Sequence, residues 1–340
     1  MKSSELSDTA RAMVARNRGI LAADESSGTI KKRFDAIKFE STEESRRLYR
    51  EMLFTTAGVG DYISGVILYD ETLRQKTKAG EPFPSYLTRH GMIPGIKVDA
   101  GAKPLAGFPG ETITEGLDGL RERLAEYYKL GAKFAKWRAV IDIGSGMPTA
   151  YAINANAAAL ARYASLCQEA GIVPIVEPEV LMDGDHTLQR CEQVTDSVLE
   201  SVFAHLFAAR IYLEGMILKP NMVISGKKCP RKAAPEEVAA ATVRCLKRHV
   251  PCAVPGIAFL SGGQGSAEAT LHLSLMNASE KLPWTLTFSY GRALQEDALS
   301  AWGGRPNSFE NGQQALFKRA KLNGLAAVGA YKLSMEAAAA

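Results

Sequence analysis

The 340-residue sequence predicts an α/β fold: a closed (β/α)8 TIM barrel that forms a single domain. Two observations support this prediction. Short apolar runs alternate with helical segments eight times, and the runs lack strict polar alternation, as strands buried on both faces should. No GxGxxG motif follows an early run, which disfavours the rival interpretation, an open doubly wound sheet that binds a dinucleotide.

The eight predicted strands share an enrichment in Val, Ile, Leu and Phe, and a polar or charged residue stands near the end of each. We expect strands over residues 19–24, 63–70, 95–99, 134–143, 172–180, 215–223, 256–261 and 286–291.

Helices between these strands have recognisable ends. Thr112 and Glu115 are spaced as a capping box before an apolar stripe over 117–127, and Gly131 follows as a C-terminal stop. Pro235, with two acidic residues after it, is typical of a first helical turn. We also expect helices over 188–202 and 294–302.

The composition excludes several classes of protein. Lys and Arg number 41 against 37 Asp and Glu, and 46% of the residues are hydrophobic, which is globular rather than disordered usage. The sequence has no apolar stretch of membrane-spanning length, no signal-peptide core and no basic run with interleaved aromatics. Five cysteines without a CxxC pair are typical of reduced thiols. We therefore expect a cytoplasmic protein that binds neither membrane nor nucleic acid.

The polar residues near the strand ends define a candidate site. In a parallel barrel all strands end at one rim, which carries the active site. Charges inside apolar strands must be paired or functional. We expect eight residues to converge at this rim: Asp24, Asp70, Lys97, Lys136, Glu177, Lys219, Ser261 and Arg292.

Lys219 lies in the apolar segment GMILKPNMV. Burial and a nearby Lys136 would disfavour an ammonium group there. A neutral amine can attack a ketone, and the protonated imine that results draws electrons from the neighbouring carbon–carbon bond. The alternative is a Lys219–Glu177 salt bridge that only holds the barrel together.

Three carboxylates are candidates for proton transfer. Glu177 and Glu179 stand two residues apart on a predicted strand, so both side chains point to the same side. They suit proton transfer during imine formation, and they are equally suited to be structural partners of Lys136 and Lys219. Asp24 is placed to take up the proton released by bond cleavage, although the local sequence LAADESSG favours an N-cap.

Two segments are suited to bind anions. Ser261, Gly262 and Gly263 follow the seventh predicted strand, and SYGR (289–292) follows the eighth, which is where barrels often bind phosphate. ESSGTIKKR (25–33) is a second candidate, with Lys97 across the rim. For that segment, a plain helix start with a solvated basic face is the alternative.

A metal site is disfavoured by the sequence. The five histidines form no HxH or HExxH motif. Asp183, Asp185 and His186 in MDGDH are polar enough to hold a cation, but a turn stabilised by Asp and Gly explains them better. We expect neither a metal nor another cofactor.

Taken together, the motifs resemble class I fructose-bisphosphate aldolases from about Arg11 to about Tyr331. The segments that carry the resemblance include LAADESSGTI, PGIKVD, FAKWR, GIVPIVEPEVL, LEGMILKPNMV, FLSGGQ and WTLTFSYGRALQ.

The resemblance implies a role for each matching residue. Lys219 would form the Schiff base and Glu177 would act as general acid/base, with Glu179 and Lys136 supporting imine formation and Asp24 assisting the carbon–carbon step. The ketone-side phosphate would lie among Ser261, Gly262, Gly263, Ser289, Gly291 and Arg292. Contacts to the substrate and its distal phosphate would come from Ser26, Thr29, Arg33, Lys97 and Arg138.

The resemblance also implies a reaction, partners and boundaries. Family members cleave fructose 1,6-bisphosphate reversibly in glycolysis and gluconeogenesis, and they are commonly cytoplasmic homotetramers. We expect the barrel with its N-terminal helix over 1–331 and a short, mobile tail over 332–340. Two departures are an ending without a terminal Tyr and Ala100 where a Lys is frequent, which would weaken distal-phosphate binding. The alternatives are a Schiff-base lyase for another ketose phosphate and a catalytically idle scaffold.

Overall fold

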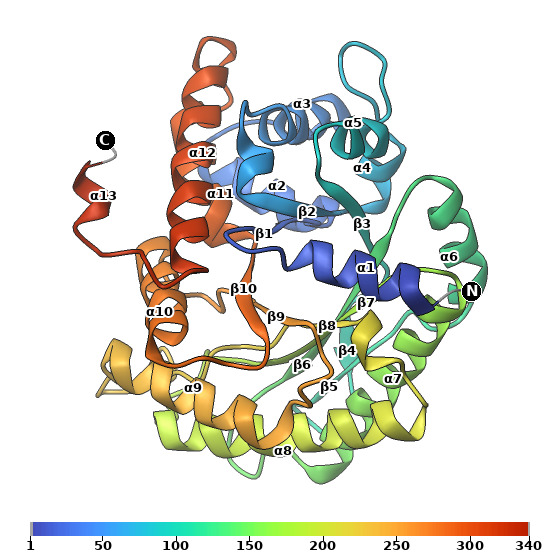
Figure 1. Ribbon diagram of the computed structural model, residues 1–340, viewed down its shortest axis with the longest axis vertical. Helices are drawn as coiled ribbons and strands as arrows, with labels where there is room; N and C mark the ends of the chain where they lie inside the picture. The colour runs from blue at the N-terminus through green and yellow to red at the C-terminus, as the bar shows by residue number, and fades with distance from the viewer. Residues whose placement is uncertain (1–2, 339–340) are drawn as a thin grey trace.

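The computed structural model describes residues 3–338, and its centre is a closed barrel of eight parallel strands wrapped by helices (Figure 1). Around the barrel the order is β1-β2-β3-β6-β7-β8-β9-β10. The strands span Gly19–Ala23 (β1), Ile63–Leu68 (β2), Ile93–Lys97 (β3), Phe134–Ile141 (β6), Val173–Val180 (β7), Ile217–Leu218 (β8), Gly256–Phe259 (β9) and Thr285–Tyr290 (β10). Each overlaps one predicted run, so the predicted barrel is confirmed.

The helices surround the barrel and fill the connections between its strands. They span Ser3–Met13 (α1), Ser27–Ala36 (α2), Glu43–Phe54 (α3), Asp70–Arg74 (α4), Phe83–Arg89 (α5), Leu120–Lys129 (α6), Ala150–Glu169 (α7), Leu188–Ala208 (α8), Pro235–His249 (α9), Ser266–Ser279 (α10), Arg292–Trp302 (α11), Phe309–Ala326 (α12) and Met335–Ala338 (α13). Short 3-10 turns lie at Val59–Asp61 (η1), Leu213–Gly215 (η2) and Pro306–Ser308 (η3). None of the helices in this described part is long and apolar enough to cross a membrane.

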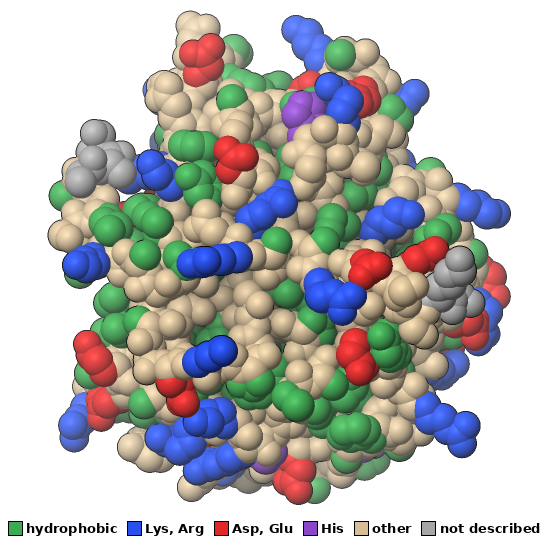
Figure 2. All heavy atoms as spheres, in the orientation of Figure 1, with side chains coloured by type: hydrophobic (Ala, Val, Ile, Leu, Met, Phe, Trp, Pro, Cys, Tyr) green, Lys and Arg blue, Asp and Glu red, His purple; other side chains and the backbone are tan. Residues whose placement is uncertain are grey.

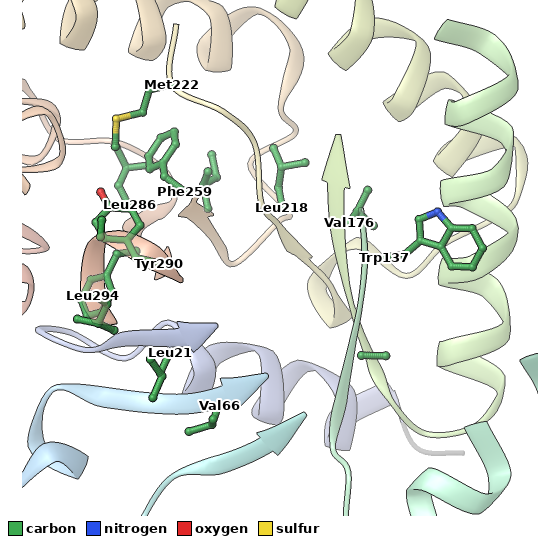
Figure 3. Close-up of a cluster of buried hydrophobic side chains, with 14 of the residues drawn as sticks. Leu21, Val66, Trp137, Val176, Leu218, Met222, Phe259, Leu286, Tyr290 and Leu294 are labelled. Atoms are coloured by element: carbon green, nitrogen blue, oxygen red, sulfur yellow. The ribbon is translucent and has the colours of Figure 1, made fainter. Parts of the chain in front are cut away.

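Alternation along each strand separates an outer apolar shell from the inside of the barrel. Figure 3 shows Leu21, Val66, Trp137, Val176 and Leu218 among the buried side chains of the outer shell. Their neighbours of opposite parity, Ile20, Ile67, Ile175 and Ile217, belong to a separate cluster inside the barrel. The same parity continues to the strand ends, so the side chains of 136, 177 and 219 are also directed inward.

Helix α1 covers the end of the barrel at which the strands begin. Its buried side chains Leu6, Ala10 and Met13 join the cluster inside the barrel. The backbone of Met13 also accepts a hydrogen bond from Ser64 on β2. Figure 1 looks onto this end, with α1 crossing in front, and Figure 2 shows acidic and basic side chains scattered over the same face.

Strand β8 is much shorter than the predicted run over 215–223. Pro220 has no N–H to continue the ladder, which ends the strand at Leu218. The buried side chain of Asn221 takes over part of the pairing, since its Oδ1 accepts the Val180 N–H at 3.0 Å. The Lys219 N–H still donates to the Val176 carbonyl at 2.8 Å, which holds this residue against β7.

The predicted capping box at Thr112 is wrong. Thr112 lies in β5 (Thr112–Thr114), which pairs with β4 (Ala102–Pro104) in an antiparallel hairpin, and the helix starts at Leu120. Tertiary contacts outweigh the local signal, because the Thr112 hydroxyl donates to the Val140 carbonyl of β6 at 3.0 Å. The predicted helix start at Pro235 and the predicted helix ends near Gly131 and residue 302 are confirmed.

The C-terminal segment is attached to the body of the protein within the described residues. Glu336 on α13 pairs with Arg319 of α12 at 2.7 Å and accepts a hydrogen bond from the Tyr331 hydroxyl. Residues 1–2 and 339–340, which belong to the predicted units 1–331 and 332–340, lie outside the described residues. That division of the chain, and a mobile tail, remain predictions.

Candidate active site

The strand ends that lie away from α1 surround a cavity of about 450 Å³. All sixteen residues that the sequence proposes for catalysis or phosphate binding line it. They come from the ends of β1, β3, β6, β7, β8, β9 and β10, from the N-cap, first turn and last turn of α2, and from the start of α11. The rim therefore collects chemical groups that are far apart in the sequence.

A chain of charged groups crosses the base of this cavity. The Lys219 Nζ lies 3.2 Å from Glu177 Oε1, and Glu177 Oε2 lies 3.5 Å from Lys136 Nζ. Lys136 Nζ in turn contacts Asp24 Oδ2 at 2.8 Å. Both lysines are about 5% exposed in their side chains, so the amines are largely shielded from water.

The charge states of Asp24 and Lys136 are set by each other. Burial by itself would raise the pKa of Asp24, but the positive charges of Lys136 and Lys219 outweigh it and hold this pKa below its usual value. Burial would lower the pKa of Lys136, and the carboxylates of Asp24, Glu177 and Asp99 instead raise it. Asp24 is thus a carboxylate and Lys136 an ammonium ion at neutral pH.

Asp99 adds a third carboxylate beside the lysines. Its oxygens lie 3.3 Å from Lys97 Nζ and 3.8 Å from Lys136 Nζ, and it accepts the backbone N–H of Gly101 at 3.2 Å. A buried carboxylate that contacts two amines fixes their relative position. Asp99 therefore holds the ends of β3 and β6 in register at the cavity.

Glu179 is occupied by a partner of its own. Its Oε2 accepts a hydrogen bond from Arg138 Nε. The prediction that Glu177 and Glu179 face the same side is confirmed, since both are buried and both line the cavity. The structure gives Glu177 the contacts to Lys219 and Lys136, whereas Glu179 keeps Arg138 at the cavity wall.

Two glycine turns form one side of the cavity. Gly262 and Gly263 have φ angles of +51° and +75°, a left-handed backbone that favours glycine. They follow Ser261 at the end of β9, and Gly291 precedes Arg292, the first residue of α11. Turns of this kind, next to a helix N-terminus and an arginine, suit a phosphate group.

The second anion-binding segment begins α2. Ser26 is the N-cap, since its side chain accepts the Thr29 N–H at 3.4 Å. The interpretation of Asp24 as the cap is therefore wrong, and its carboxylate instead contacts Lys136. Ser26, Thr29 and Arg33 all face the cavity rather than only solvent.

Asp70 does not join the other strand-end residues. It begins α4 and pairs with Arg74 at 3.0 Å, in a half-exposed position away from the cavity. The MDGDH segment also lies outside the chain of charges, and Asp183 pairs there with Lys227 at 2.7 Å. Among residues 3–338, no group of three or more His, Cys, Asp and Glu is arranged to hold a metal ion.

Comparison with known proteins decides the family. The family model described as "Fructose-bisphosphate aldolase class-I" matches residues 5–340. The chain belongs to the class I fructose-bisphosphate aldolase family. The resemblance inferred from the motifs is thus confirmed over nearly the whole sequence.

Individual aldolases agree with this assignment. The probable fructose-bisphosphate aldolase class 1 of Xanthomonas campestris pv. campestris is 58% identical over 333 residues, which cover 98% of this chain and 100% of that protein. Fructose-bisphosphate aldolase B of Gallus gallus is 56% identical over 331 residues, 97% of this chain and 91% of that one. The Plasmodium falciparum aldolase, solved with TRAP and a small molecule inhibitor, superimposes with a TM-score of 0.96 at 50% identity and covers 97% of this chain and 96% of its own.

Sequence reasoning on this aldolase missed two carboxylates at the cavity. Asp99 stands two residues after Lys97, so the parity argument used for Glu177 and Glu179 would have found it. Glu25 directly follows Asp24 and also lines the cavity, but nothing in the sequence indicates its two arginine partners.

Proposed function

We propose that the chain cleaves fructose 1,6-bisphosphate reversibly to dihydroxyacetone phosphate and glyceraldehyde 3-phosphate, through a Schiff base on Lys219. One observation supports this most strongly. The Lys219 amine lies 3.2 Å from a carboxylate, in a shielded cavity that also contains two phosphate-type segments. A nucleophilic amine, a proton acceptor and two anion sites are what a bisphosphorylated ketose needs.

Substrate binding in this proposal uses both segments. The ketone-side phosphate binds at Ser261, Gly262, Gly263, Ser289, Gly291 and Arg292. The distal phosphate and the sugar hydroxyls meet Ser26, Thr29, Arg33, Lys97 and Arg138. The hydroxyl of Ser289 supports this assignment, because it is 1% exposed, has no hydrogen-bond partner in the described structure and lines the cavity.

Imine formation uses the contact between Lys219 and Glu177. Glu177 takes a proton from the Lys219 ammonium, and the free amine adds to the ketone carbon. The carbinolamine then loses its hydroxyl as water, with Glu177 returning the proton, and a protonated imine remains. The salt bridge that the sequence offers as an alternative is present, and the same carboxylate that forms it is the base that this step requires.

Bond cleavage uses Asp24. Its carboxylate accepts the proton of the hydroxyl next to the breaking carbon–carbon bond, and the bond electrons move to the iminium group to give an enamine. Glyceraldehyde 3-phosphate leaves, and the enamine carbon takes up one proton, which balances the proton that Asp24 accepted and then gives up. Water then hydrolyses the imine and releases dihydroxyacetone phosphate and the free lysine. The lowered pKa of Asp24 keeps this group deprotonated, and the adjacent Lys136 ammonium stabilises negative charge that forms during the step.

The test is to trap the imine. The protein is incubated with dihydroxyacetone phosphate, reduced with borohydride and mapped by mass spectrometry. We expect one adduct on the Lys219 peptide and none in the variant Lys219→Met. Lys227→Met is the matched control, because Lys227 also lines the cavity but pairs with Asp183 in a half-exposed position. An adduct on another lysine, or cleavage that EDTA abolishes, would contradict the proposal.

We further propose that the chain forms a homotetramer in the cytoplasm. Two large apolar side chains on the outer helices support self-association: Tyr151 on α7 is 56% exposed and Phe207 on α8 is 60% exposed. The five cysteines support a reducing compartment, since all are free thiols. Light scattering after size exclusion tests the first statement, and cell fractionation tests the second.

A further inference from the structure

A buried cluster of charges begins at the cavity wall with Arg33 and Glu25 and extends behind it to Arg50, and neither Glu25 nor Arg50 has a role in the steps above. Glu25 accepts hydrogen bonds or ion pairs from three side chains. Its Oε1 contacts Arg33 and the Gln295 amide, the latter at 3.0 Å, and its Oε2 contacts Arg50 Nη2 at 2.6 Å. Gln295 also donates to the Ala22 carbonyl of β1 at 2.7 Å. The cluster therefore links β1, α2, α3 and α11, which lie together in the upper part of Figure 1.

The inner part of this cluster is shielded from solvent. The side chains of Arg50 and Glu25 are 3% and 6% exposed. Tyr49 is fully buried, donates its hydroxyl to Gln295 at 3.0 Å and stacks on Trp302 with ring centroids 5.5 Å apart. In such an environment charges interact strongly, and an unpaired charge is costly.

The two arginines differ in their access to the cavity. Arg33 lines the cavity and is 22% exposed, whereas Arg50 is behind it and does not line it. The cluster contains two guanidinium groups and one carboxylate. Asp24, the next carboxylate along the chain, is already paired with Lys136. The cluster thus has one cation more than it has anions, and its excess positive charge faces the cavity at Arg33.

We propose that Arg50 is a positioning residue for phosphate binding. By keeping Glu25 paired, it leaves the Arg33 guanidinium available to a phosphate of the substrate. This inference rests on the proposed function, in which Arg33 meets the distal phosphate. When the phosphate binds, Arg33 shifts part of its hydrogen bonding from Glu25 to the phosphate, and Glu25 retains Arg50 and Gln295.

The charges of the cluster support this division of roles. Burial would raise the pKa of Glu25, but Arg50 and then Arg33 hold it below its usual value, so Glu25 stays ionised. Without Arg50, the buried Glu25 carboxylate would depend on Arg33 alone. Arg33 would then be held by Glu25, and a phosphate would have to compete for it.

The experiment compares two substrates in three variants. Arg50→Met removes the charge, Arg50→Lys retains it, and Glu25→Gln with Arg50→Met removes both charges of the pair. For Arg50→Met we expect the KM for fructose 1,6-bisphosphate to rise about tenfold with kcat within about twofold of wild type. The KM for fructose 1-phosphate, which lacks the distal phosphate, stays within about twofold. In Arg50→Lys the KM for fructose 1,6-bisphosphate stays near the wild-type value, because Glu25 keeps a cationic partner. In the double variant this KM also lies near the wild-type value, because residue 25 no longer carries a charge that holds Arg33.

The split in KM between the two substrates separates positioning from a merely structural role. Removal of both charges also relieves a structural defect of the unpaired Glu25, so the urea midpoint recovers under either role. Only positioning predicts that Arg50→Met raises the KM for the bisphosphate while the KM for fructose 1-phosphate and kcat stay near wild type. Arg46→Met is the matched control, because Arg46 is on the same helix and pairs with Glu71 at 2.6 Å but does not line the cavity. We expect its KM values to stay at wild-type level.

Two results would overturn the proposal: an unchanged bisphosphate KM in Arg50→Met, or a double variant no better than the single one. If Arg50→Met does not fold, a bisphosphate KM raised more than about fivefold in the double variant has the same meaning. Should the wild-type protein cleave neither sugar, the proposed function fails separately. The cluster is then tested by the rise in Tm that inorganic phosphate produces, which must fall in Arg50→Met and recover in the double variant.

Discussion

Replacement of Lys136 by Met tests the central charge of the site. The Lys136 Nζ lies 2.8 Å from Asp24, 3.5 Å from Glu177 and 3.8 Å from Asp99. Together with Lys219 and Lys97, it balances three carboxylates with three ammonium groups. The substitution keeps the length of the side chain and leaves three buried carboxylates facing two amines.

The contacts allow the size of the effect to be worked out. At 2.8 Å and an effective dielectric constant of about 20, one ion pair is worth roughly 6 kcal/mol of Coulomb attraction. The desolvation cost of burying an ammonium group offsets part of this, so a loss of about 3–5 kcal/mol of unfolding free energy is expected. We expect kcat to fall about 10²–10⁴-fold, because Asp24 and Glu177 both lose their contact with the Lys136 ammonium group.

The loss of stability depends on pH, and its sign follows from Asp24. In the wild type its folded pKa is depressed, so its contribution is complete above the unfolded pKa of about 4 and is lost as pH falls toward the folded value. In Lys136→Met the same buried carboxylate, with less positive charge beside it, favours its protonated form. The variant is therefore destabilised further as pH rises, and the gap to wild type is larger at pH 8 than at pH 5.

Urea unfolding at the two pH values measures this gap. Lys227→Met is the control, because its partner Asp183 is 56% exposed and such pairs contribute about 1 kcal/mol or less. The reasoning is refuted if Lys136→Met stays within about 1 kcal/mol of wild type at pH 8, or if the gap does not grow between pH 5 and pH 8.

Three further predictions concern single positions. Asp24→Asn should lower kcat about 10²–10⁴-fold in the cleavage assay while the Lys219 adduct still forms on borohydride reduction; an unchanged cleavage rate would exclude Asp24 as the proton acceptor. Arg292→Ala should raise the KM for fructose 1,6-bisphosphate about 10–100-fold, since hydrogen bonds from a charged group to phosphate are lost, and an unchanged KM would place the phosphate elsewhere. Gly95→Ala should reduce the unfolding free energy by about 1–3 kcal/mol in a urea titration, because its Cβ would overlap the ring of Phe134 inside the barrel; equal midpoints would show that the ring moves aside.

Much of the barrel could be predicted from the sequence because its strands are buried on both faces. Runs such as ISGVILYD have no continuous polar face, and this pattern can be recognised within a few consecutive residues. The convergence of Asp24, Lys136, Glu177 and Lys219 then follows from topology, since parallel strands end at one rim. The assignment needs no knowledge of individual contacts.

Features that depend on tertiary partners could not be predicted. Thr112 has the spacing of a helix cap, and only its hydrogen bond to β6 makes it part of a strand. Asp70 ends an apolar run as Asp24 does, yet it turns outward to Arg74. Arg50 stands in SRRLYREM among charges typical of a solvated helix face, and its burial against Glu25 joins residues 25 positions apart.

The position of helix α1 determines the path by which substrate and products reach the cavity. Its side chains Leu6, Ala10 and Met13 close the end of the barrel at which the strands begin. In the part of the chain that the structure describes, the Lys219 amine therefore reaches solvent through the cavity at the opposite end. In the proposed reaction the sugar enters through this opening, and both triose phosphates leave through it. In the proposed mechanism the aldehyde product leaves first, and water then releases the half that is bound to Lys219 as an imine, so the two products leave in a fixed order.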